Sequence, residues 1–248
     1  MNTNFVVVEL QQGTSQWLAW RHNGIGASEA STIMGENRFE SASMLLQKKR
    51  GPVILDSFQN EAMALGTQLE PEARKLYIAK TGKDVRPVCV QSSRYDWLRA
   101  SLDGLSTNHD AVVEIKCGAS VYRRVSQSRS VPDYYYGQVQ HILAVTGLDS
   151  LDFWCYWPDN PALLLPVERD DKYIERLLSK ELEFWNLVKQ ATTTRRIVLI
   201  NMIDTGNPEE DTHKLRSAMK LLLEFPGQDS VQVEIASKGQ RTRLEMPL

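Results

Sequence analysis

The sequence predicts an α/β fold in which a mixed central sheet is flanked by helices. Two features indicate it: strand-like apolar stretches in the middle of the chain, and segments around them whose apolar residues recur three and four positions apart. At 248 residues, with 42% hydrophobic and 24% charged residues, the chain is long enough for one sizeable core. We expect that core over residues 1–190 and a small accessory module over 191–248.

The elements at the start of the chain are short. VVVEL at position 6 forms a segment of its own, and GTSQWLAWRHNG predicts a helix that is capped by Thr14 or Ser15 and stopped by Gly24. The next stretch, GIGASEASTIMG, is typical of a turn that opens another short helix.

A longer helix is predicted over residues 58–81. Apolar residues at three- and four-residue spacings give it one apolar face, and Gly82 follows as a stop. Pro71 lies beside Glu70 inside this pattern, and we expect it to break or kink the helix there.

The predicted sheet begins with three strand-like stretches that are separated by the turn-prone SSRYD and the loop DGLSTNHD. These stretches are VRPVCVQ at 85, WLRASL at 97 and AVVEIKC at 111. Pro132 then opens a helix that Gly147 ends, and SLDFWCYW at 150 with ALLLPVE at 162 predicts a strand pair joined across PDNP. A helix from Asp170 to about Lys189 closes the core.

The tail beyond residue 190 has a different texture. It contains a strand-like IVLINM, a helical pattern around HKLRSAMKLLLEF, and two strands about an SKGQ turn. This order predicts a small C-terminal β-α-β-β appendage.

Several protein classes are excluded by what the sequence lacks. No apolar run approaches the roughly 18 residues that span a bilayer, and the N-terminus has no leader pattern, so we expect a cytoplasmic protein without membrane contact. Cys89, Cys117 and Cys155 are far apart in apolar runs, so we interpret them as buried thiols. The four histidines are scattered without the spacing of a zinc site.

The overall charge does not by itself indicate a nucleic-acid-binding protein. The formal net charge is -2, whereas phosphate contacts usually come from a basic surface. Local basic patches can still meet phosphates if carboxylates are gathered at a metal site. The candidate patches are RHNG at 21, QKKR at 47, and the cluster of Arg123, Arg124 and Arg129.

The residues that carry chemistry lie on two predicted strands. Asp103 ends one strand, and in VVEIKC the alternation of a strand places Glu114 and Lys116 on one face. Two such carboxylates can share hard cations such as Mg²⁺, while the lysine orients or helps to deprotonate a water, a combination that suits phosphodiester hydrolysis. Glu70 could add a ligand from its helix. On spacing alone, solvated charges on a strand face remain the ordinary alternative.

Ordered motifs change that balance. RHNGIGASEAS, LGTQLEPEARKLY, SLDG, VVEIKC, YYYGQVQHILAVTG and VERDDKYIERL follow one another over about residues 13 to 190. In this order they resemble the phage-lambda exonuclease family, also called YqaJ-like viral recombinases, within the PD-(D/E)xK nuclease superfamily. The resemblance implies a restriction-endonuclease-like core.

The resemblance also implies roles for individual residues. Asp103 and Glu114 would be metal ligands together with the main-chain carbonyl of Ile115, and Glu70 would support a second metal site. Lys116 would handle the attacking water, and Gln138 would position substrate or ligands. A pocket for a 5′-phosphate would fall on Arg21, Ser28 and Ser101.

Plainer interpretations stay open for several of these residues. Arg21 can be an ordinary surface arginine, and Ser28 can be a helix N-cap. Gln138 and Gln140 straddle a helix turn, so only one should face the site; we choose Gln138 and take a solvent-facing amide as the alternative for either. Tyr135 is a candidate DNA contact, although a tyrosine there more often fills space in the core or on the surface.

The activity that the resemblance implies is 5′ to 3′ exonucleolytic digestion of one strand of linear double-stranded DNA. It would start at a 5′-phosphorylated end, use two Mg²⁺ ions with Mn²⁺ as a substitute, and leave 3′ single-stranded DNA for recombination by annealing. The family includes ring-shaped trimers and works beside single-strand annealing proteins, so both are expected partners. The alternatives are an endonuclease or single-strand nuclease with the same site, and a non-catalytic DNA-binding recombination scaffold.

Overall fold

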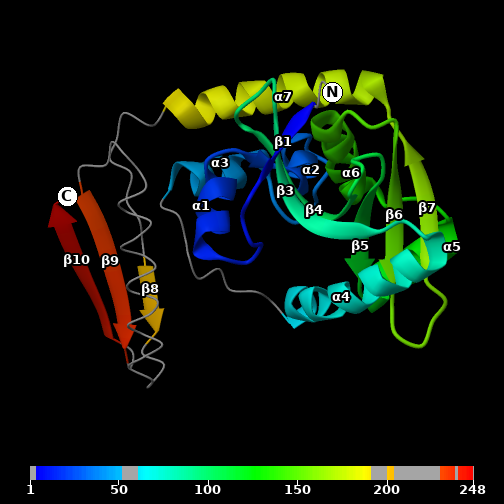
Figure 1. Cartoon of the computed structure of the whole chain (residues 1–248). Coiled ribbons are helices and arrows are strands. Elements are labelled where there is room, and N and C mark those ends of the chain that lie inside the picture. Colours follow the sequence, from blue (N-terminus) through cyan, green and yellow to red (C-terminus); the bar gives the residue numbers. More distant parts are fainter. Residues whose placement is uncertain (1–3, 52–60, 191–199, 204–229, 238–239, 248) are drawn as a thin grey trace.

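The computed structural model describes residues 4–51, 61–190, 200–203, 230–237 and 240–247. Its main feature is a seven-stranded mixed sheet with helices on both faces (Figure 1). The strands are β1 (Phe5–Val8), β2 (Ile25–Gly26), β3 (Val85–Ser92), β4 (Leu98–Ser106), β5 (Val112–Cys117), β6 (Ser150–Tyr156) and β7 (Leu163–Glu168). The helices are α1 (Ser15–His22), α2 (Ala30–Ile33), α3 (Ala42–Arg50), α4 (Glu61–Thr81), α5 (Ala119–Ser128), α6 (Asp133–Thr146) and α7 (Asp171–Gln190), with a 3-10 turn η1 (Ala27–Glu29) before α2.

The sheet has the strand order β1-β3-β4-β5-β6-β7, and β2 pairs with β4 off this path. Its ladders are antiparallel except for the parallel pairs β5–β6 and β2–β4. Because parallel neighbours need a crossover, α5 and α6 lie in the connection from β5 to β6. The predicted mixed sheet flanked by helices is confirmed.

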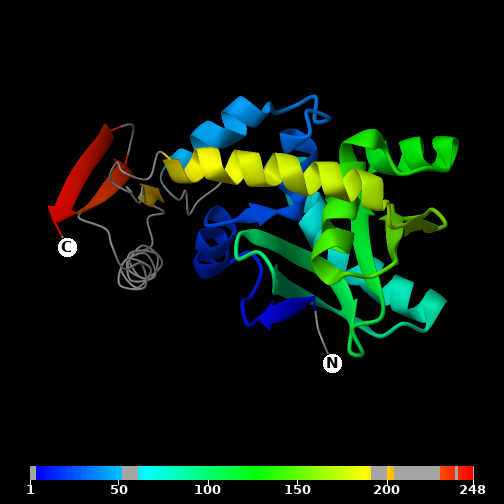
Figure 2. The same ribbon diagram turned by 90° about the horizontal axis from the view of Figure 1, so that it is seen from above.

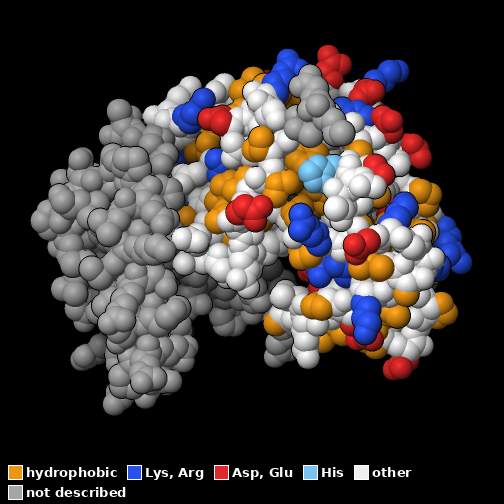
Figure 3. All heavy atoms as spheres, in the orientation of Figure 1, with side chains coloured by type: hydrophobic (Ala, Val, Ile, Leu, Met, Phe, Trp, Pro, Cys, Tyr) orange, Lys and Arg blue, Asp and Glu red, His pale blue; other side chains and the backbone are white. Residues whose placement is uncertain are grey.

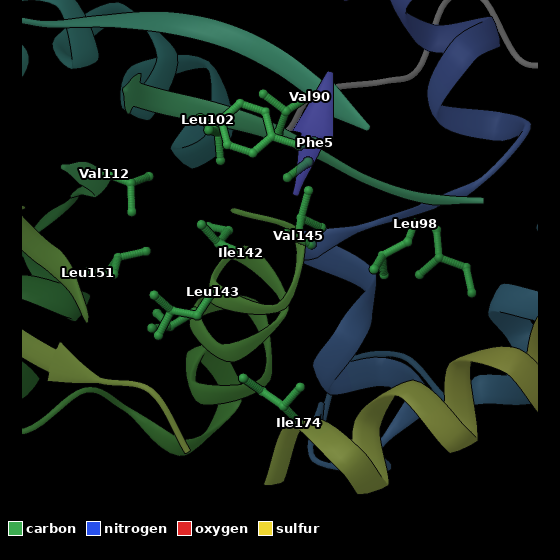
Figure 4. Close-up of a cluster of buried hydrophobic side chains, with 14 of the residues drawn as sticks. Phe5, Val90, Leu98, Leu102, Val112, Ile142, Leu143, Val145, Leu151 and Ile174 are labelled. Atoms are coloured by element: carbon green, nitrogen blue, oxygen red, sulfur yellow. The ribbon is translucent and has the colours of Figure 1, made fainter. Parts of the chain in front are cut away.

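Each face of the sheet is covered by different helices, because the strand side chains alternate between the two faces. On one face, Leu102 and Val112 pack with Ile142 of α6 and Ile174 of α7 in the larger core, whose side chains Figure 4 shows. On the other face, Tyr77 of α4 packs against Val113, Ile115 and Trp154. Figure 2 shows α7 lying along the core.

The helix ends follow the local signals. The Thr14 hydroxyl accepts a hydrogen bond from Trp17 N, so Thr14 is the N-cap of α1. Gly82 and Gly147 follow α4 and α6 with φ of +71°, a conformation that glycine adopts without steric cost. Pro132 is the N-cap of α6.

Three helical features differ from the expectations. The helix does not break at Pro71, because α4 runs through this exposed residue without interruption; a kink there stays a prediction. Burial of Ala73 and Tyr77 against the sheet, 0% exposed in both cases, stabilises the helix although proline cannot donate a backbone hydrogen bond. The helices α3 and α5 were not anticipated from the sequence.

A second, separate sheet lies in the tail. It consists of β8 (Ile200–Ile203), β9 (Ser230–Ser237) and β10 (Gln240–Pro247) in the order β10-β9-β8, with β9–β10 antiparallel and β8–β9 parallel. The strands predicted for the tail are therefore present. The helix predicted around HKLRSAMKLLLEF lies outside the described residues, and the domain boundary at residue 190 stays a prediction. In the part of the chain that is described, no helix has the length and apolarity to cross a membrane.

Candidate active site

An open cleft of about 1280 Å³ lies at one side of the sheet. Every residue that the sequence analysis assigned to metal binding, catalysis or the 5′-phosphate pocket lines this cleft, and so does Tyr135. Residues separated by more than 100 positions in the chain, from Arg21 to Gln138, therefore share one concave surface. A cleft with convergent polar groups is where catalysis is expected.

The cleft opens where β4 and β5 part. Their paired residues are Gly104 with Val113 and Leu105 with Val112, and the ladder does not extend to Asp103. In place of a strand partner, the backbone N–H of Ile115 donates to Asp103 Oδ2 at 2.7 Å. The carboxylate thus satisfies a backbone group that the parting of the strands would leave without a partner. Asp103 is placed beside β5 by this bond.

Glu114 and Lys116 of β5 form a closed hydrogen-bonded group with Gln138 of α6. Glu114 Oε1 accepts from Lys116 Nζ at 2.6 Å and from Gln138 Nε2 at 2.6 Å, and Lys116 Nζ also donates to Gln138 Oε1 at 3.2 Å. The choice of Gln138 as the amide that faces the site agrees with these contacts. Glu114 is only 2% exposed, and its Oε2 has no hydrogen-bond partner.

The group holds a lysine ammonium next to a buried carboxylate. Burial lowers the pKa of Lys116, but the carboxylates of Glu114 and Asp103, together with Tyr135, raise it, and the net shift is upward. The Tyr135 ring lies 4.5 Å from Lys116 Nζ. Lys116 is therefore a cation in this arrangement.

The carboxylates of the cleft disfavour one another's charge. Burial raises the pKa of Asp103 well above its usual value, and the charges of Glu114 and Glu70 raise it further. Burial also raises the pKa of Glu70, against the lowering effect of Arg74, with which it forms an ion pair. Arg74 Nε donates to the backbone oxygen of Asp103 at 2.6 Å and so ties α4 to β4.

These residues fit a hard divalent cation by the chemistry of their donors. Asp103, with its raised pKa, is a group whose charge a cation would stabilise, and Glu114 Oε2 is a buried oxygen without a partner. Among the described residues, no group of three or more His, Cys, Asp or Glu side chains is arranged to hold a metal ion. The hydrogen bonds of the two carboxylates occupy Asp103 Oδ2 and Glu114 Oε1, whereas Glu114 Oε2 is the oxygen without a partner.

The residues predicted for a terminal phosphate line the same cleft. Arg21 Nη2 donates to the Ser28 hydroxyl at 2.8 Å, and Ser28 is exposed. The N-cap of the turn η1 is Gly26, so the alternative of Ser28 as a helix cap is wrong. The Ser101 hydroxyl accepts from Trp17 Nε1 at 2.7 Å.

The sequence analysis did not single out Trp17. Its ring lies under the Arg21 guanidinium, 4.7 Å from the ring centroid, so Trp17 contacts both Arg21 and Ser101. The available signal was the four-residue spacing of Trp17 and Arg21, which places both on one side of α1.

Comparisons with known proteins agree with the fold and the motifs. The model of the YqaJ-like viral recombinase domain matches residues 16–149, more than half of the chain. The chain belongs to this family. It is 30% identical over 180 residues to the uncharacterized protein YqaJ of Bacillus subtilis (strain 168). The matched region covers 71% of this chain and 56% of that protein. This YqaJ-like chain thus matches little more than half the length of that relative.

Solved structures show the same fold. The alkaline exonuclease LHK-Exo from Laribacter hongkongensis superposes with a TM-score of 0.59 at 24% identity, covering 84% of the YqaJ-like chain and 100% of LHK-Exo. A phage-related exonuclease from Haemophilus somnus 129PT superposes with a TM-score of 0.54 at 12% identity, covering 71% and 98% of the two chains. At these identities the likeness establishes the architecture.

Only some of the predicted basic patches of the YqaJ-like chain lie at the cleft. Arg21, Arg123 and Arg124 line the cleft, the last two from the unanticipated helix α5. The QKKR patch is not a free basic surface: Lys48 pairs with Glu40, and Lys49 is buried. On the face seen in Figure 3, lysine and arginine side chains are interspersed with acidic ones, in keeping with the small net charge.

Two further expectations need correction. Gln140 is 0% exposed; it donates to the Glu168 backbone oxygen at 2.9 Å and accepts from Asp170 N, so the solvent-facing alternative is wrong for it. Cys89 and Cys155 are buried thiols as expected, but Cys117 is only half-buried because it lines the cleft.

Proposed function

We propose that this protein is a metal-dependent exonuclease that degrades one strand of linear double-stranded DNA in the 5′ to 3′ direction. It starts at a 5′-phosphorylated end and leaves 3′ single-stranded DNA for recombination by annealing. One observation carries the proposal: a single cleft contains both the carboxylate and lysine group around Glu114 and the Arg21–Ser28 pair. Membership of the viral recombinase family supports it.

The metal is proposed to be Mg²⁺, with two ions bound and Mn²⁺ as a substitute. The ligands would be Asp103, Glu114 and the backbone carbonyl of Ile115, with Glu70 at the second position. When bound, such ions activate the attacking water and stabilise the leaving oxygen of a phosphodiester.

The protein's own groups would bind and orient the substrate. The Lys116 ammonium, 2.6 Å from Glu114 Oε1, offers a positive charge and donors to the water and to the scissile phosphate. Gln138 holds Glu114 and Lys116 in register through its two hydrogen bonds. Tyr135 would contact the DNA, and the face of its ring packs against the Lys116 ammonium.

Preference for a chain end is proposed to come from Arg21, Ser28 and Ser101 in the same cleft. An arginine fork with the Ser28 and Ser101 hydroxyls can accept the additional charge of a terminal phosphate, which an internal phosphodiester does not carry. The two solved relatives named above are described as exonucleases.

We also propose that three copies form a ring around the DNA, and that a single-strand annealing protein receives the product strand. Basic side chains such as Arg123 and Arg124, which line the cleft, would then face the enclosed duplex. Light scattering on the purified protein should give the mass of three chains; a single-chain mass at working concentration would contradict the ring.

A comparison of three DNA substrates tests the activity. Linear duplex with 5′-phosphate ends, the same duplex with 5′-hydroxyl ends, and closed circular duplex are each incubated with the protein in Mg²⁺ or in chelator. We expect rapid release of nucleotides from the phosphorylated duplex, slow release from the hydroxyl duplex, and none from the circle or in chelator. Cutting of the circle would indicate an endonuclease, and binding without cleavage would indicate a scaffold.

A further inference from the structure

A lysine of α3 is buried beneath the Arg21–Ser28 pair. Lys49 is 7% exposed, and its Nζ contacts three acceptors: the backbone oxygens of Arg21 at 2.9 Å and Gly24 at 2.7 Å, and Glu29 Oε1 at 2.8 Å. Three acceptors match the three N–H groups of an ammonium, whereas a neutral amine has only two. The side chain is therefore charged, and its hydrogen bonds are complete.

The partner carboxylate lies close to the Arg21 guanidinium. Glu29 Oε2 accepts from Gly26 N at 2.9 Å. A side-chain carbon placed on Gly26 would lie 3.6 Å from Arg21 Nε and 3.9 Å from Glu29 Oε2, so both charged groups flank the same backbone position. Arg21 nevertheless donates to Ser28, and Glu29 is paired with Lys49.

A buried ion pair of this kind is weak evidence for stability. Removing two charges from water costs several kcal/mol per ion in effective terms, and well-packed apolar residues often do as well or better. Burial lowers the pKa of Lys49, Glu29 raises it, and the nearby Arg21 and Arg99 lower it, with a net shift downward. The Glu29 carboxylate thus lies within a group of cations, and Lys49 is the one that neutralises it directly.

We propose that Lys49 is a positioning residue for recognition of the 5′-phosphate. It holds the backbone at Arg21 and Gly24, and it neutralises Glu29 so that the Arg21 guanidinium stays available to a phosphate. This inference rests on the proposed function.

The consequence of losing Lys49 follows from charge. Without the ammonium, the half-buried Glu29 carboxylate keeps its hydrogen bond from Gly26 N but loses its ion-pair partner, so its charge attracts the Arg21 guanidinium and repels a phosphate dianion. Removing the Glu29 charge as well takes away this competitor. A purely structural lysine would change the rates on phosphorylated and hydroxyl ends in the same proportion, so the ratio of the two rates would stay at the wild-type value.

The test uses the full chain and the ratio of initial digestion rates on 5′-phosphate and 5′-hydroxyl ends of one linear duplex. The variants are Lys49→Met, the double variant Lys49→Met with Glu29→Gln, and the control Lys48→Met, which removes the same charge from the neighbouring, 66% exposed side chain. We expect the ratio to fall roughly tenfold or more in Lys49→Met, as for a lost charge-assisted contact. It should recover largely in the double variant and stay at the wild-type value in the control.

Each result decides between the ideas. A wild-type ratio in Lys49→Met, or a double variant no better than Lys49→Met, overturns the role of Lys49 while the proposed exonuclease stands. If Lys49→Met does not fold, the neutral double variant decides: a ratio close to wild type supports charge neutralisation, and a ratio of one overturns it. A wild-type protein without preference for phosphorylated ends overturns the 5′-phosphate pocket itself, and this inference with it.

Discussion

At the scale of single residues, one carboxylate oxygen organises the centre of the cleft. Glu114 Oε1 accepts hydrogen bonds from Lys116 and Gln138 together, in a site with little exposure to water. Buried hydrogen bonds of this kind reinforce one another, so the three side chains are expected to respond as a unit to substitution. The charge of Lys116 is the part that no neighbour can replace.

We predict that Lys116→Ala lowers the rate of DNA digestion by about 100-fold or more while duplex binding is retained. The ammonium contributes to water and phosphate at the reacting centre, whereas affinity for DNA comes from several cations. Single-turnover digestion and a binding titration measure the two effects. Lys75→Ala, which removes an exposed lysine on α4, is the control. A variant that digests like wild type would refute the assignment.

The Arg21 guanidinium gives a second prediction at this scale. Arg21→Ala should lower the rate on 5′-phosphorylated ends roughly tenfold and leave the rate on 5′-hydroxyl ends nearly unchanged. The reason is that the fork contacts the terminal phosphate rather than the scissile one. Initial rates on the paired substrates check this. An equal loss on both substrates would instead indicate a general DNA contact.

At the scale of elements, α6 is the helix that carries Gln138 to the site, and it lies between the sheet and α7. Two contacts define its position. Gly137 approaches α2 so closely that a Cβ would lie 2.7 Å from Ser31 Oγ and 3.0 Å from Ser31 N. His141 Nδ1 lies 2.7 Å from Glu181 of α7, and its Nε2 lies 2.9 Å from the backbone oxygen of Arg99 on β4.

Gly137→Ala is predicted to destabilise the protein by about 1–3 kcal/mol. Helix propensity alone favours alanine by roughly 1 kcal/mol, but the contact with the α2 backbone outweighs it. Urea unfolding measures the difference. Gly66→Ala in α4 is the matched control, since its Cβ would be at an ordinary 3.6 Å from the Cys117 oxygen and should not destabilise. Equal stability changes in both variants would contradict the packing argument.

The His141–Glu181 pair predicts a pH dependence of stability. Burial lowers the pKa of His141, but Glu181 raises it, with a net upward shift. The folded state then holds the proton more tightly than the unfolded state. The stabilisation is complete below the usual histidine pKa of about 6.5 and is lost as pH rises through the raised, folded-state value.

Glu181→Gln should therefore lower the free energy of unfolding by roughly 3 kcal/mol at pH 6 and flatten its decline towards alkaline pH. Urea titrations between about pH 6 and 9 compare the slopes. Glu183→Gln, an exposed position on the same helix, should keep the wild-type slope. An unchanged slope in Glu181→Gln would show that another group controls the pH dependence.

At the scale of the whole molecule, positive charge is not in excess, but part of it is placed at the cleft. The chain has 29 lysines and arginines against 31 aspartates and glutamates, yet several arginines line the cleft. Counterion release by cations that contact phosphates makes DNA affinity fall with salt. The position of cations, and not the net charge, should thus control binding.

Replacing Arg123 and Arg124 together by alanine is predicted to weaken binding of duplex DNA at all sequences. The slope of log affinity against log salt should decrease in magnitude by about 1 to 2, because each lost phosphate contact removes roughly 0.9. Salt titrations in chelator, which prevents digestion, measure this slope. Changing Lys172 and Lys180, two exposed lysines of α7, removes the same charge as a control. Equal slopes for the two double variants would exclude α5 from the DNA interface.

Much of the molecule could be predicted from local patterns. Apolar periodicity identified α4, α6 and α7 and the principal strands, and glycines marked the ends of α4 and α6. The helix α5 was missed because ASVYRRVSQS contains two valines and several serines, which are weak helix formers. It is helical because Val121 and Val125, one turn apart, are both buried against the core.

The sequence by itself determined the local periodicities, the strand alternation that puts Glu114 and Lys116 on one face, and the ordered motifs that indicate the family. The tertiary structure decided which groups meet: Asp103 with the N–H of Ile115 across the parting strands, Trp17 with Ser101, and Lys49 with Glu29. Such partners are distant in sequence, and periodicity encodes only the face on which a side chain lies. The packing of the helices on the sheet determines which distant residue that side chain contacts.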